Sequence, residues 1–321
     1  MLASVPCADP EEAPARVHPS TAWPPREDPR SRAVGLVHHH ISAQTDSTSV
    51  VVCPNGIILK THQSPPAVVV RGDRGIVVAW SAASRRRYRE SVVRLPMIAY
   101  QYEIAHLTYP GTWSHDWRRW KRDLHRLELA LVRDWPDLYI GLLWVLEIQR
   151  RGAPHYHAFI QLRQSPGRLF PKWLSRTWYR VVGSDDPRHL AAGTRCVPLN
   201  THLPGGLRRA ALYLAKYTGK SEQKTLIDQA TGQVVPIGRM WGKSRGLVLS
   251  ELATFRITDK QRVLFSRAIR RWGHRSSYQS KVGKAFKGCL IYGDPSSFRQ
   301  LLRVIIPEAE LAEAFSQPRG P

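Results

Sequence analysis

Hydrophobic and polar residues follow two periods in the central part of the chain. From Met97 to Tyr109 they alternate, which predicts a β-strand, because strand side chains point to opposite faces in turn. Apolar residues then recur at steps of three and four, at Trp117, Trp120, Leu124, Leu127 and Leu131. This spacing predicts a helix with one apolar face, and Ser114 is its expected N-cap. Pro171 is expected to open another helix, Lys172 to Val182.

Two apolar, β-rich runs, Tyr139 to Gln149 and His155 to Leu162, surround a short polar segment. A tight turn at Arg150-Arg151-Gly152 joins them as a hairpin in this interpretation, since the last position of such a turn is left-handed and favours glycine. Pro154 then begins the returning strand, where a missing N–H is tolerated. Strands, a hairpin and helices together predict an α+β fold with helices on an antiparallel sheet.

The hairpin register places three polar side chains on one face. Glu147 pairs across from His155 and lies diagonally from His157, because residues two apart on a strand share a face. Two imidazoles and one carboxylate suit a divalent ion such as Mg²⁺ or Mn²⁺, with open positions for a substrate oxygen. The alternative is a pair of hydrogen-bonded strand histidines beside an exposed glutamate.

A further helix is predicted from about Leu207 to Thr218, before Gly219. Tyr213 and Tyr217 lie four residues apart, so both hydroxyls emerge from one helical face. Lys216 and Lys220 each follow a tyrosine by three residues. A phenol with a pKa near 10 is a poor nucleophile unless nearby cations favour its ionised form, and these lysines could do so or hold a phosphate. The alternative is an amphipathic helix with half-buried tyrosines.

The composition favours a polyanionic partner. Lys and Arg number 48 against 25 Asp and Glu, giving a formal net charge of +23. Charge alone fits ribosomal, chromatin or membrane-surface proteins equally well. The four cysteines are widely scattered, which indicates neither a zinc ribbon nor a disulfide framework and suits a reducing cytoplasm. No apolar stretch approaches the length of a membrane span, so no membrane contact is expected.

Two motifs together point to a known family. Glu147-x7-His155-Tyr156-His157, followed by Tyr-x-x-Lys-Tyr-x-x-Lys at 213–220, resembles the His-hydrophobe-His (HUH) endonucleases. Within them the chain is most similar to the replication initiators of rolling-circle plasmids and small single-stranded DNA phages. Leu107-Thr108-Tyr109-Pro110 looks like the first family motif, and Gly238-Arg239-Met240-Trp241-Gly242 is similar to a downstream segment of plasmid initiators. The resemblance covers about 97–247, just under half of the chain.

The resemblance implies a metal-assisted transesterification on single-stranded and origin DNA, on a mainly antiparallel sheet of about five strands. Glu147, His155 and His157 would hold the ion, and a tyrosine would attack the scissile phosphate to leave a 5′-phosphotyrosine and a free 3′-OH. Tyr217 is the first choice for the initial attack, with Tyr213 as its partner. The chain lacks a Gly-x4-Gly-Lys-Ser phosphate loop, so a separate host helicase is a further hypothesis.

The expected organisation has four parts. Residues 1–34 form a disordered, Pro- and Arg-containing tail, and 35–95 a β-rich appendage ending in a basic linker at Ser84 to Arg89. Residues 96–247 form the catalytic domain. The basic, mostly helical region 248–321, with Thr258 capping a helix to about Trp272, either binds double-stranded origin DNA or packs as a solvated extension. Two rival functions stay open: a two-tyrosine transposase, and a non-catalytic DNA-binding regulator of the same fold.

Overall fold

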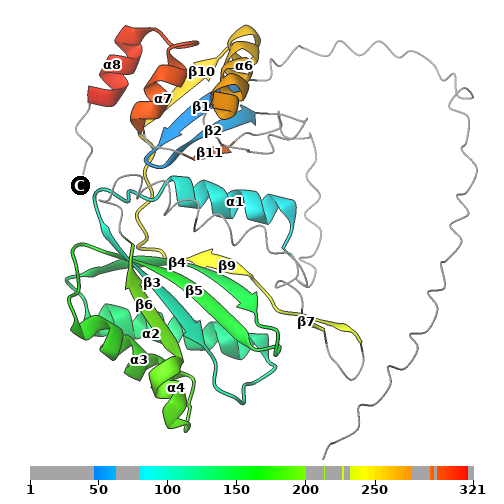
Figure 1. The fold of residues 1–321 in the computed structure, drawn as a ribbon, viewed down its shortest axis with the longest axis vertical. Helices are drawn as coiled ribbons and strands as arrows, with labels where there is room; N and C mark the ends of the chain where they lie inside the picture. The colour runs from blue at the N-terminus through cyan, green and yellow to red at the C-terminus, as the bar shows by residue number, and fades with distance from the viewer. Residues whose placement is uncertain are drawn as a thin grey trace, which may run out of the picture. The chain divides into compact units, whose positions relative to one another are not determined.

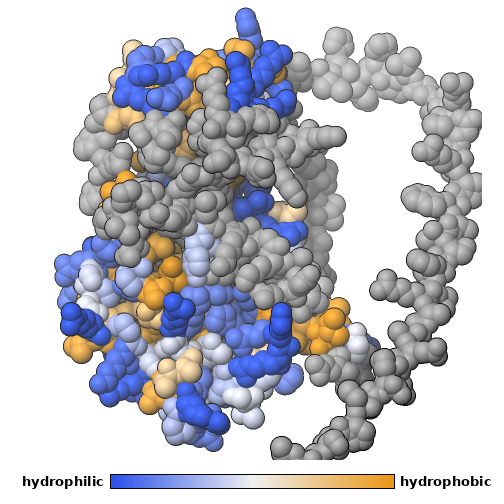
Figure 2. Space-filling view, in the orientation of Figure 1, coloured by the Kyte–Doolittle hydropathy of each residue, from blue (hydrophilic) through white to orange (hydrophobic). Residues whose placement is uncertain are grey.

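The computed structural model describes residues 47–62, 80–199, 213, 226–227, 232–275, 290–292 and 295–316. The chain divides into two units, Met1–Gln44 and Thr45–Pro321, and all described residues belong to the second. The expected N-terminal tail therefore lies outside the described residues. No helix in the described part is long and apolar enough to cross a membrane. Figure 2 shows hydrophilic side chains interspersed with smaller hydrophobic areas on one face of the molecule.

The central part of the chain forms a five-stranded antiparallel sheet, the central sheet, with the strand order β6-β3-β5-β4-β9 (Figure 1). Its strands are β3 (Gln101–Thr108), β4 (Tyr139–Ile148), β5 (Pro154–Leu162), β6 (Thr194–Pro198) and β9 (Trp241–Lys243). The helices that follow these strands are α2 (Trp117–Asp134), α3 (Leu169–Val181) and α4 (Pro187–Ala192). The predicted α+β fold, with a mainly antiparallel sheet and flanking helices, is confirmed.

The hairpin of β4 and β5 has the predicted register. Glu147 pairs with His155, and Ile148 pairs with Pro154, which begins β5. The turn has Gly152 at φ +82°, in the left-handed region that favours glycine. Its N–H donates to the carbonyl of Gln149 at 2.8 Å. The local sequence therefore determines both the turn and the face on which Glu147 lies.

Helices α2 and α3 cover one face of the central sheet. Their apolar side chains enter the main core, namely Trp120, Leu124, Leu127, Leu131, Phe170, Leu174 and Trp178. Two predicted boundaries were wrong. Asp116, not Ser114, caps α2, because its Oδ1 accepts from the N–H of Arg118 at 2.9 Å. Helix α3 begins at Leu169 and holds Pro171 in its first turn, where a proline removes no helical hydrogen bond.

Strands from both ends of the described chain build a second, four-stranded sheet, the outer sheet, with the order β10-β1-β2-β11. They are β1 (Ser47–Cys53), β2 (Gly56–His62), β10 (Ala253–Ile257) and β11 (Leu290–Tyr292). Helices α6 (Asp259–Arg275), α7 (Pro295–Leu302) and α8 (Glu308–Ser316) accompany it. A second core joins the outer sheet to these helices, including Val50, Leu59, Phe255, Phe265 and Phe298. The parts of the chain before and after the central sheet thus share one core.

Two helix starts near the outer sheet illustrate capping. The hydroxyl of Thr258 accepts from the N–H of Gln261 at 3.3 Å, and the Gln261 side chain accepts from the N–H of Thr258 at 2.8 Å. This reciprocal pair is a capping box, so the predicted cap at Thr258 is confirmed. The expected linker at Ser84 to Arg89 is instead helical, within α1 (Ala82–Val93). It folds because Ser81 caps the helix and Tyr88 is buried beneath the arginines.

The Gly-Arg-Met-Trp-Gly segment forms the edge of the central sheet. Strand β9 pairs with β4, placing Gly242 opposite Trp144. A Cβ on Gly242 would lie 2.6 Å from the Trp144 ring, so only glycine fits without rearrangement. The indole N–H of Trp241 donates to the hydroxyl of Ser84 at 2.8 Å, which joins β9 to α1. A short hairpin of β7 (Leu226–Ile227) and β8 (Val234–Val235) precedes this segment.

Candidate active site

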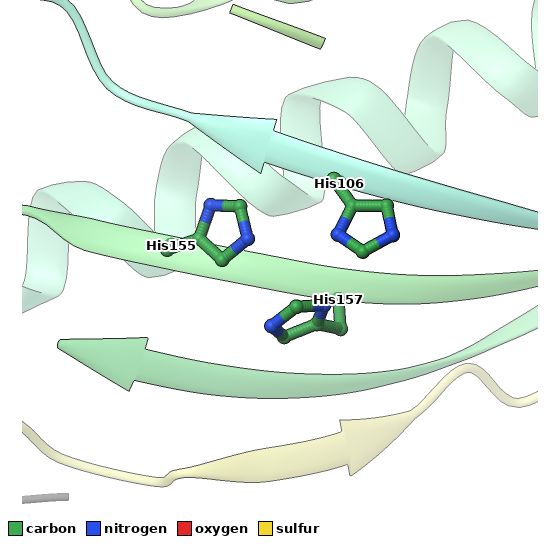
Figure 3. A group of neighbouring side chains, drawn as sticks. All are labelled: His106, His155 and His157. Carbon is green, nitrogen blue, oxygen red and sulfur yellow. The ribbon is translucent and has the colours of Figure 1, made fainter. Parts of the chain in front are cut away.

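Three neighbouring strands bring four polar side chains to one face of the central sheet. His155 and His157 lie on β5, Glu147 on β4 and His106 on β3. His106 pairs directly with His157, and Glu147 pairs with His155. One ring nitrogen from each histidine can be chosen so that the three nitrogens lie within 4.8 Å of one another (Figure 3). The Oε2 of Glu147 lies 3.0 Å from Nε2 of His157, so the carboxylate adjoins this histidine cluster.

The cluster lies in a mostly apolar environment. Glu147 and His157 are each only 5% exposed, whereas His106 and His155 are half-buried. The rings meet edge to face, with centroids 4.5 Å apart for His155 and His157 and 4.8 Å apart for His106 and His157. Electrostatic interactions are stronger here than in water, because little solvent screens them.

Thr108 fixes the orientation of His155. Its hydroxyl lies 3.0 Å from Nδ1 of His155, and if that nitrogen carries the proton, Nε2 keeps a lone pair for a ligand bond. The backbone of Thr108 is itself held. Its carbonyl accepts from the indole N–H of Trp178 and from Nε2 of His189, both at 2.8 Å. Side chains from α3 and α4, on the far face of the sheet, therefore brace the strand that orients His155.

Tyr213 reaches the histidine cluster from a helical segment. Its hydroxyl lies 3.2 Å from Nε2 of His106. The structure therefore brings together Tyr213, Glu147, His155 and His157 from the predicted set, and adds His106. Tyr217, Lys216 and Lys220 lie outside the described residues, as does the predicted helix at 207–218 apart from Tyr213.

His106 was missed by the interpretation of the sequence. It belongs to the predicted strand at 97–109 and precedes the Leu107-Thr108-Tyr109-Pro110 segment, so a usable signal was present. Strand alternation places His106 on the same face as Thr108. What the local pattern does not give is the register between β3 and β5, which sets His106 opposite His157.

The arginine of the hairpin turn holds this end of the site together. Arg151 donates to the carbonyl of Tyr109 at 2.5 Å and to that of Pro110 at 2.8 Å. Its guanidinium also lies over the Trp113 ring, 4.8 Å from the centroid. These contacts join the β4–β5 turn to the end of β3, so the strands that carry the four polar residues keep a fixed relationship. Partial burial lowers the pKa of Arg151.

The residues present fit a divalent metal ion. Metal–nitrogen bonds of about 2.1 Å require ligand nitrogens within about 4 Å of each other, so the observed spacing needs only small side-chain shifts. A donor set of imidazoles with one carboxylate is softer than the all-oxygen sets that Mg²⁺ and Ca²⁺ prefer. The site is thus better matched to Mn²⁺ than to Mg²⁺.

Comparisons with known proteins place this site in a functional context. A family model that describes replication-associated proteins of the ORF2 type matches residues 104–222, a range that contains His106, Glu147, both histidines of β5 and Tyr213. The chain is 26% identical over 233 residues to a replication-associated protein of Pseudomonas phage Pf3, covering 68% of this chain and 77% of that protein. No solved structure matches significantly. The two matches support a role as a replication initiator.

Proposed function

We propose that this protein initiates rolling-circle replication by nicking and rejoining one strand of origin DNA through a covalent 5′-phosphotyrosine. The observation that carries the proposal is the position of the Tyr213 hydroxyl, 3.2 Å from His106 in a cluster of three histidines and Glu147. A nucleophile beside a set of metal-ligand side chains is what a phosphodiester transesterification requires. The matched range 104–222 contains the whole arrangement.

The residues have distinct roles in the proposed reaction. The phenolic oxygen of Tyr213 attacks the scissile phosphorus, the bond from phosphorus to the 3′ oxygen breaks, and the phenolic proton is balanced by the proton that the leaving 3′ oxygen gains. His106 orients the phenol through its Nε2. Glu147, His155 and His157 hold a divalent ion, which when bound polarises the phosphate. Because the phosphotyrosine retains the ester bond energy, rejoining needs no ATP.

The order of the tyrosines in this proposal differs from the sequence-based expectation. Tyr217 was the first choice from its lysine context, but Tyr213 is the tyrosine that contacts the cluster in the described structure. We assign the first attack to Tyr213 and the second to Tyr217, with Lys216 and Lys220 favouring the ionised phenols or binding the phosphate. A host helicase for strand separation and a cytoplasmic location remain part of the proposal.

One experiment tests the proposal. The protein is incubated with Mn²⁺ and labelled single-stranded DNA that spans the origin of its own replicon, and covalent adducts are resolved after denaturation. We expect an adduct in the wild type and in the control Tyr100→Phe, and none in Tyr213→Phe or His157→Ala. Binding without an adduct in Mn²⁺, Mg²⁺ or Zn²⁺ would contradict it and favour the non-catalytic regulator. Cleavage at transposon ends, but not at a replication origin, would favour the transposase.

A further inference from the structure

A groove of about 690 Å³ lies beside α3, away from the histidine cluster. The ring of Trp178 in α3 contacts Tyr156, whose side chain lies on the opposite face of β5 from His155 and His157. The groove therefore belongs to the helical side of the central sheet. No role in the proposed reaction accounts for it.

Aromatic side chains form the walls of this groove. They are Trp135, which follows α2, and Trp173 and Tyr179 of α3, all partly exposed. Trp173 is held in place, because its indole N–H donates to Asp134 at 3.0 Å and its ring stacks on Phe170 with centroids 5.6 Å apart. A fixed, partly exposed ring offers a stacking surface at little entropic cost.

Cations line the same groove at a regular spacing. Lys172, Arg176 and Arg180 follow one another at intervals of four residues on α3, so they lie on successive turns about 6 Å apart. The nearby acid, Asp134, is already engaged by Arg133 at 2.6 Å and by Trp173. The groove therefore presents a row of positive charges beside aromatic surfaces.

We propose that this groove binds single-stranded DNA as a second contact on the far side of the central sheet. A row of cations suits successive phosphates, and aromatic walls suit unpaired bases. An acidic peptide would satisfy the charges but would leave the rings without matching flat partners. The choice of DNA as the ligand rests on the proposed function, whereas the groove and its lining do not.

Fluorescence anisotropy with a labelled oligo(dT), which lacks any origin sequence, measures this binding directly. We expect Lys172→Glu/Arg176→Glu to bind about tenfold more weakly than the wild type and to show a shallower salt dependence, because fewer counterions are released. We expect Trp173→Ala to weaken binding by about tenfold as well, through lost stacking. Circular dichroism confirms that each variant is folded.

The matched control is Arg267→Glu/Arg271→Glu on the exposed side of α6, which changes the net charge equally. Equal losses in the control and the α3 variant would overturn the proposal, because net charge alone would then explain binding. Undiminished binding in the α3 variants would also overturn it. Adduct formation is scored separately with His157→Ala, which is expected to lose nicking but keep oligo(dT) binding. Each proposal can therefore fail without the other.

Discussion

The hydroxyl of Tyr213 lies 3.2 Å from Nε2 of His106, although 107 residues separate them in the chain. His106 in turn pairs with His157 across the β3–β5 ladder, and its ring meets that of His157 edge to face. Tyr213, His106 and His157 thus form one continuous set of contacts. The tyrosine is connected to the candidate metal ligands through His106.

Substituting His106 tests this connection. We expect His106→Ala to slow adduct formation by about 10²-fold, because the phenol loses the group that orients it. His106→Gln, which keeps a polar side chain able to hydrogen-bond the phenol, should recover part of the rate. The measurement is the single-turnover rate of adduct formation at saturating Mn²⁺, which separates positioning of Tyr213 from metal affinity. Full activity in His106→Ala would refute this role.

Removal of the hydroxyl of Thr108 tests how His155 is held. We expect Thr108→Val, which keeps the shape of the side chain, to weaken Mn²⁺ binding by about 10- to 100-fold, because the hydrogen bond to Nδ1 of His155 is lost. Titration calorimetry measures the affinity without any DNA. Thr108→Ser should restore most of it, and Thr254→Val on an exposed position of β10 serves as the control. An unchanged affinity in Thr108→Val would show that Thr108 does not support the site.

The reach of the sequence depended on how local each feature is. The β4–β5 hairpin was predicted in full, because the turn at Gly152 and the alternation around it determine the register of Glu147 and His155. The place of His106 was not, since pairing between β3 and β5 joins strands separated by α2 and β4. The outer sheet was missed for the same reason, as β1 pairs with β10 from the other end of the chain.

The hairpin turn can be tested by removing its glycine. We expect Gly152→Ala to lower the free energy of unfolding by about 1 kcal/mol, because an L-residue is strained at positive φ. Sterically an added Cβ fits, since its nearest neighbours lie 3.6 and 3.7 Å away. Gly152→Asn should cost less, because asparagine adopts the left-handed region more readily. Urea denaturation measures all three proteins, with Gly111→Ala, where a Cβ meets nothing within 4 Å, as the control. Equal effects at both glycines would contradict the argument.

Lys121 provides a pH-dependent test of the helical side of the central sheet. Its Nζ lies 4.5 Å from the centroid of the Trp144 ring and 5.3 Å from that of Tyr156. Burial, with a smaller contribution from the charge of Arg239, lowers the pKa of Lys121 to about 7. The unfolded chain, in which this pKa is near 10.5, therefore binds more protons between those values, and the free energy of unfolding rises with pH across that window.

Replacing Lys121 with methionine should remove this contribution. We expect the free energy of unfolding of Lys121→Met to rise less between pH 7 and 9 than that of the wild type, and to exceed the wild-type value most clearly near pH 7. The range stops at pH 9 because tyrosines of the unfolded chain begin to ionise above it. Urea denaturation at each pH gives the two curves, and Lys172→Met on the exposed side of α3 is the control. Parallel curves for Lys121→Met and the wild type would show that Lys121 keeps an ordinary pKa in the folded protein.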